Sequence, residues 1–72
     1  MKNLTFALKN DQEYIPLINL LQVLNIAQSG GHAKIMVSEG EVKVNGEVEL
    51  QKRKKIRSGD HIELAAVKVT IE

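Results

Sequence analysis

The sequence contains no cysteine and no tryptophan, and its only aromatic residues are Phe6 and Tyr14. Without cysteine the chain can form neither disulfide bonds nor thiolate metal sites, and its composition suits a reducing compartment. With only two aromatic rings, the core has to be built mainly from Val, Ile and Leu side chains. Proteins that bind extended single-stranded nucleic acids usually stack bases on several aromatic rings, so the composition disfavours that class of protein.

Long apolar runs are also absent. No stretch approaches the roughly 20 apolar residues that a membrane-spanning helix needs. The first residues lack the apolar segment of a signal peptide. We therefore expect a cytoplasmic protein that does not associate with membranes. A chain of 72 residues has room for one hydrophobic core, so we expect a single domain over residues 1–72, present as a monomer.

The charges are unevenly distributed along the chain. The net charge is only +1, but residues 32–57 carry seven cations against four glutamates. Five of these cations fall within six positions, without an acidic residue among them: Lys52, Arg53, Lys54, Lys55 and Arg57. Such a cluster repels itself, and the usual compensation is a polyanionic partner. The distribution therefore indicates a nucleic-acid-binding module.

The apolar pattern of the first half predicts a strand followed by a helix. Apolar residues at positions 4, 6 and 8 alternate with smaller or polar ones, as in a half-buried strand. Pro16 fits the first position of a helix, where its missing N–H costs nothing. An apolar helical face follows, formed by Leu17, Leu20, Leu21 and Leu24.

A second helix is expected to begin after Ser29, a favourable N-cap residue. Its inward stripe would consist of Ala33, Met36 and Val37, and Gly40 would end it in the left-handed conformation. Gly30 and Gly31 weaken the first turn by propensity, so another requirement has to explain them. They could open the helix N-terminus to a phosphate, or they could only let the chain turn into the helix. A positive φ at Gly31 would be a further reason for glycine.

The second half of the chain is rich in strands. Val42 and Val44 alternate with polar residues, Asn45-Gly46 is a strong hairpin signal, and Val48 and Leu50 continue the alternation beyond it. Turns at 58–60 and 65–66 would separate two further strands. The predicted order is β-α-α-β-β-β-β, an α+β fold with early helices and a strand-rich second half.

Residues 29–64 resemble a known family. A helix that starts at serine and contains A-K is followed by a glycine, V-x-V-N-G, a basic segment and G-D-x-I. These elements are Ser29, Ala33-Lys34, Gly40, Val42 to Gly46, Lys52 to Arg57, and Gly59 to Ile62. In this order they resemble the S-four (S4) RNA-binding domain with its alpha-L motif, and in particular its small stand-alone bacterial members. One departure is that Gly30 stands where the wider family has an arginine.

The resemblance implies binding of structured RNA, ribosomal or transfer RNA being favoured, with ribosomal proteins as further candidate partners. The second helix and the hairpin over residues 42–50 would form one continuous face. The predicted RNA-binding residues are Ser29, Gly30, Gly31, Lys34, Lys43, Asn45, Lys52, Arg53, Lys54 and Lys55.

Other interpretations stay open at this point. The cation cluster could be a solvated strand edge, or the basic face could dock an acidic protein partner. An enzyme is not expected, because nothing around the glutamates at 39, 41, 47 and 49 indicates a catalytic pocket. His32 and His61 have no third ligand beside them, so neither a metal nor another cofactor is expected.

Overall fold

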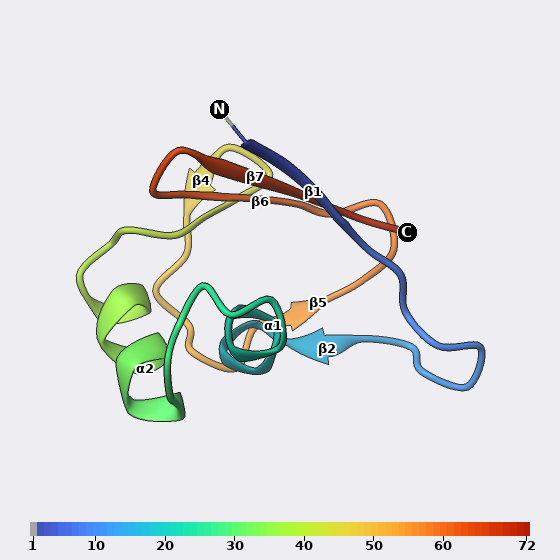
Figure 1. Cartoon of the computed structure of the whole chain (residues 1–72), viewed down its shortest axis with the longest axis horizontal. Coiled ribbons are helices and arrows are strands. Elements are labelled where there is room, and N and C mark those ends of the chain that lie inside the picture. Colours follow the sequence, from blue (N-terminus) through green and yellow to red (C-terminus); the bar gives the residue numbers. More distant parts are fainter. Residues whose placement is uncertain (1) are drawn as a thin grey trace.

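A computed structural model describes residues 2–72, in which two helices and seven strands form an α+β fold (Figure 1). The fold class and the two early helices agree with the sequence prediction. In chain order the elements are β1 (Lys2–Phe6), β2 (Ile15–Pro16), α1 (Leu17–Val23), α2 (Gly30–Ser38), β3 (Lys43–Val44), β4 (Glu47–Val48), β5 (Lys55–Ile56), β6 (His61–Leu64) and β7 (Val67–Ile71).

The strands form two separate sheets. Five strands pair in the order β1-β7-β6-β3-β4, in which β1 runs parallel to β7 and the other neighbours are antiparallel. The sequence analysis misses the second sheet, an antiparallel pair of β2 and β5, because two-residue strands are too short to show a period of two. Figure 1 shows the large sheet across the top, with the helices and the β2–β5 pair below it.

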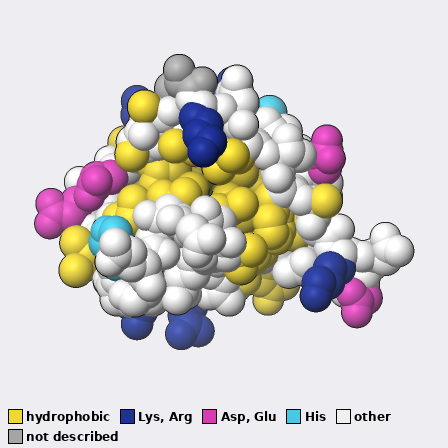
Figure 2. Space-filling view, viewed as in Figure 1, with side chains coloured by type: hydrophobic (Ala, Val, Ile, Leu, Met, Phe, Trp, Pro, Cys, Tyr) yellow, Lys and Arg dark blue, Asp and Glu magenta, His cyan; other side chains and the backbone are white. Residues whose placement is uncertain are grey.

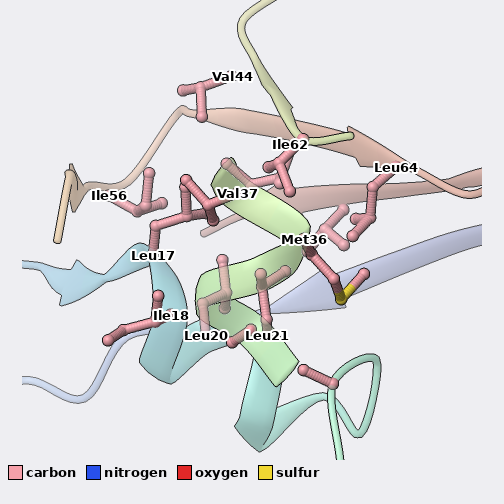
Figure 3. Close-up of a cluster of buried hydrophobic side chains, with 14 of the residues drawn as sticks. Leu17, Ile18, Leu20, Leu21, Met36, Val37, Val44, Ile56, Ile62 and Leu64 are labelled. Atoms are coloured by element: carbon pink, nitrogen blue, oxygen red, sulfur yellow. The ribbon is translucent and has the colours of Figure 1, made fainter. Parts of the chain in front are cut away.

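Aliphatic side chains fill the space between the large sheet and the helices, as the shortage of aromatic residues predicts (Figure 3). Leu17 of α1, Val37 of α2 and Ile62 of β6 belong to one cluster of buried residues and are fully buried. Ile56 of β5 is also fully buried in this cluster, so the small sheet shares the same core. Figure 2 shows hydrophobic side chains in a band between the two layers, with Lys and Arg toward the edges.

Helix α1 begins one residue later than predicted. Pro16 has an extended conformation, with φ −61° and ψ 141°, and it pairs in β2, so it is the N-cap residue rather than the first helical residue. Leu17, Leu20 and Leu21 are fully buried, as predicted. Leu24 follows the last helical residue and is half-buried.

The hairpin between β3 and β4 turns at Asn45-Gly46, as predicted, with φ of 53° and 87° at the two residues. A two-residue turn places Val48 directly opposite Lys43, on the face of the sheet away from the buried Val44. Val48 is accordingly 51% exposed and Leu50 is 61% exposed. The prediction that these two residues continue the inward alternation is therefore wrong.

The side chain of Asn45 joins this turn to the turn that precedes β6. Its Nδ2 donates to Asp60 Oδ1 at 3.1 Å, and its Oδ1 accepts from the His61 N–H at 2.9 Å. The other carboxylate oxygen of Asp60 accepts from the Arg57 N–H at 2.8 Å. One network thus fixes two turns that lie 15 residues apart in the sequence.

Replacing Asn45 with glycine should lower the free energy of unfolding by about 1–2 kcal/mol, measured by urea denaturation. Glycine keeps the positive φ but loses both side-chain hydrogen bonds, each worth about 0.5–1.5 kcal/mol. The matched control is Ala66→Gly in the turn between β6 and β7, where Ala66 has a φ of 63° and no side-chain hydrogen bond to lose. Glycine relieves strain at that position, so the control should be neutral or stabilising. Equal effects in the two variants would contradict a role for the Asn45 side chain.

Candidate nucleic-acid interface

The basic segment, Lys52 to Lys55, runs from a turn at Lys52-Arg53 into β5. The side chains of Lys52, Arg53 and Lys55 are exposed and Lys54 is half-buried, while the next residue, Ile56, is fully buried in the core. The cations therefore lie at the protein surface, and the burial of Ile56 anchors the end of the basic segment in the core.

The backbone of the basic segment caps helix α1. No side chain caps this helix, and its first N–H groups need acceptors. The Leu17 N–H donates to the Lys54 carbonyl at 2.9 Å, and the Ile18 N–H donates to the Lys52 carbonyl at 3.2 Å. These carbonyl groups are held at the helix terminus, so the cationic residues are held at a defined place beside α1.

The N-terminus of α2 is capped by Ser29, as predicted. The Ser29 hydroxyl oxygen accepts from the His32 N–H at 3.1 Å, and His32 Nδ1 accepts from the Gln28 N–H, also at 3.1 Å. Ser29 therefore caps the helix, while His32, at the position that glutamate takes in a capping box, accepts from the residue before the N-cap instead of from the N-cap residue itself. The sequence analysis considered His32 only as a metal ligand, so this hydrogen bond of an exposed residue was missed.

Neither Gly30 nor Gly31 has a positive φ, so the backbone does not require glycine at these positions. A Cβ on Gly31 would approach no closer than 3.9 Å to the Ser29 hydroxyl, and one on Gly30 would lie 3.7 Å from the Gln22 side chain. Both are ordinary contacts. The explanation that glycine serves a left-handed conformation at Gly31 is thereby excluded. Lys34, one turn further on, is exposed.

Lys43 lies on a different surface from these residues. It is exposed beside the buried Val44, so its side chain faces away from the helices. In the register of the sheet, Lys43 of β3 lies opposite Glu63 of β6, and Glu63 lies opposite Lys68 of β7. This row of alternating charge partly balances Lys43. The structure therefore does not bring Lys43 to the side of the sheet on which α2 and the basic segment lie.

Asn45 was predicted as an RNA contact, but both atoms of its side-chain amide are used within the fold, by Asp60 and His61. One amide hydrogen is left for a ligand. The structural role of Asp60 was missed, because its partner lies 15 residues away and no local pattern indicates the pair.

Tyr14 was also missed. Two cations lie over its ring in cation–π geometry, with Lys55 Nζ 5.1 Å and the Arg57 guanidinium carbon 5.8 Å from the ring centroid. The pairing of β2 with β5 brings these residues together, and that pairing was not predicted.

Two further findings bear on ligands. Among residues 2–72, no three His, Cys, Asp or Glu side chains gather closely enough to hold a metal ion. The described helices include none with the length and apolar character required to cross a bilayer.

Comparison with known proteins assigns the family. The sequence model of the S4 domain matches residues 8–72. YbcJ of Escherichia coli strain K12 is 39% identical over 67 residues, which are 93% of this chain and 94% of that protein. The probable ribosome maturation protein RlbA of Bacillus subtilis strain 168 is 41% identical over 54 residues, 75% of this chain and 76% of that protein.

The fold of YbcJ is also similar. Its solution structure, described as revealing an alfaL motif involved in RNA-binding, superposes on this chain with a TM-score of 0.67 and 40% sequence identity, covering 92% of this chain and 85% of that one. The order of serine-capped helix, Asn-Gly hairpin, basic segment and Gly-Asp turn agrees with this likeness. On the sequence match and the shared fold together, this chain belongs to the S4 domain family.

Proposed function

We propose that the protein binds structured RNA through its phosphate backbone and acts as a binding protein rather than as an enzyme. The proposed interface consists of the N-terminus of α2 and the basic segment. The observation that carries the proposal is the anchoring of the basic segment on α1 by two backbone hydrogen bonds, which presents four cations without an acidic residue among them. Family membership and the alfaL motif of YbcJ support it.

Both cationic side chains and backbone amides would bind the phosphates of the RNA. Lysine and arginine neutralise phosphates and release counterions, which gives affinity without sequence preference. The first-turn N–H groups of a helix also favour anions. Gly31 is exposed and adds no side chain over the first turn of α2, whereas the Gln22 side chain lies near Gly30. Lys34, one turn later, could contact the same phosphate.

The proposed ligand is ribosomal RNA, with transfer RNA as the alternative. A relative that is named a probable ribosome maturation protein supports this choice, and ribosomal proteins would then be neighbours of the bound protein in the cytoplasm. A folded RNA fits better than an extended strand, since a row of stacked bases needs several aromatic platforms and the chain has two aromatic residues.

Affinity for a hairpin fragment of ribosomal RNA should fall steeply with salt. If about 4–6 phosphates are neutralised, the plot of log affinity against log salt concentration should have a slope of roughly −3 to −5. Fluorescence anisotropy across a potassium chloride series measures this slope. No binding at low salt, or a slope near zero, would contradict the proposal.

The double variant Arg53→Ala/Lys54→Ala should bind the same hairpin more weakly and reduce the salt slope by about 2, one unit for each lost phosphate contact. Its stability should change little, because Arg53 is exposed and the capping carbonyl of Lys54 belongs to the backbone. The matched control is Lys2→Ala/Lys9→Ala, which removes the same charge from exposed positions outside the proposed interface. Equal losses of affinity in both double variants would show that only net charge matters.

Gly31→Ala should raise the free energy of unfolding by up to about 1 kcal/mol, since alanine suits a helix better and no clash opposes it. The same variant should bind RNA more weakly, because the added methyl group covers the first-turn amides. Thermal melts and RNA titrations on this one variant separate the two effects. Greater stability with unchanged affinity would remove the glycine pair from the interface.

A further inference from the structure

Tyr14 and the two cations beside it lie on one surface of the β2–β5 sheet. Ile15 pairs with Ile56 and Pro16 pairs with Lys55, so Tyr14 and Arg57 follow as the next opposed residues. Ile15 and Ile56 point into the core, being 5% and 0% exposed. Side chains alternate between the two faces of a strand, so the neighbours of these isoleucines point outward. The 5.1 Å and 5.8 Å distances from the ring to the cations agree with this geometry.

The ring of Tyr14 is accessible and has few conformations to choose from. Tyr14 directly precedes β2, whose first residue, Ile15, is buried, and a tyrosine side chain has only two rotatable bonds. The backbone of Arg57 is held as well, because its N–H donates to an Asp60 carboxylate oxygen at 2.8 Å. With both cations beside it, Tyr14 still has 37% of its surface exposed. It is thus a largely pre-organised aromatic platform next to positive charge.

An aromatic ring flanked by cations matches the chemistry of a single nucleotide. Lys55 and Arg57 lie over the ring, so a base would stack on the part of the ring that they leave exposed while its neighbouring phosphates meet the two cations. The bases of a regular duplex are already stacked on one another, so the ring can engage only a base that has left the helix, such as a bulged or loop nucleotide. Stacking of a base on an aromatic side chain adds affinity that an alanine substitution removes.

We propose that Tyr14, Lys55 and Arg57 form a site for one unpaired nucleotide within an otherwise structured RNA. The proposal rests on the RNA binding proposed above and adds a selective element to it. Phosphate contacts at α2 and the basic segment hold the folded RNA, and Tyr14 selects RNAs in which one base is unstacked beside that contact. The chain has one tyrosine, so a single base is the expected number.

Two RNA hairpins of the same sequence, one with a single bulged adenosine and one fully paired, test the proposal by anisotropy titration. The wild-type protein should bind the bulged hairpin more tightly. Tyr14→Ala should lose on the order of tenfold in affinity for the bulged hairpin and change little for the paired one. Tyr14→Phe keeps the ring and should retain the preference, whereas Tyr14→Leu keeps apolar bulk alone and should lose it.

NMR gives a second readout that needs no variant. Selective labelling of tyrosine yields signals from Tyr14 alone, and labelling of phenylalanine yields signals from Phe6, which packs against the core from β1. A stacked base should shift the ring protons of Tyr14 upfield when the bulged hairpin is added, while Phe6 should stay unchanged. This measurement decides the question even if Tyr14→Ala fails to fold.

The outcomes separate the nucleotide site from RNA binding itself. Equal affinity of the wild-type protein for the two hairpins, with Tyr14 signals unmoved, would overturn the nucleotide site and leave RNA binding standing. Equal losses for both hairpins in Tyr14→Ala would assign the ring a structural role and would also overturn the site. Binding of neither hairpin by the wild-type protein would overturn the proposed function.

Discussion

The capping of α1 by the backbone carbonyls of Lys52 and Lys54 is the interaction on which the rest of this structure depends. It supplies hydrogen-bond acceptors to the first N–H groups of a helix that has no side-chain cap, and it acts together with the β2–β5 pairing. Ile56, directly after the basic segment, is buried in the common core. The same few residues therefore complete the hydrophobic layer and present the cations. A small domain can hold such a repulsive cluster in place because the attachment uses the backbone and leaves most of the charged side chains exposed to water.

Two kinds of surface result from this arrangement. On the helical side, the capped N-terminus of α2, the basic segment and the ring of Tyr14 offer amide donors, cations and one aromatic platform. On the outward side of the large sheet, Lys43 stands in a row with Glu63 and Lys68, where opposite charges balance one another. This difference in charge favours the helical side as the surface that binds a polyanion. The sequence alone does not distinguish the two sides, because both carry lysine residues.

Features set by local sequence could be predicted, and features set by distant pairing could not. The Ser29 cap, the inward stripe of α2 and the Asn45-Gly46 turn each depend on residues that are close together in the sequence. All three predictions are confirmed. The link from Asn45 to Asp60 and the meeting of Tyr14 with Arg57 depend on strand pairings that leave no local period. The exposure of Val48 was predictable in principle, because a two-residue turn fixes the register.

Chemical-shift mapping of the backbone amides during titration with a ribosomal RNA hairpin tests most directly the claim that the helical side is the interface. The account predicts that the largest shifts fall in residues 29–34 and 52–57, with little change at Lys43 and along β6 and β7. Large shifts at Lys43, Glu63 and Lys68, with residues 52–57 unchanged, would place the RNA on the outward side of the sheet and contradict the account.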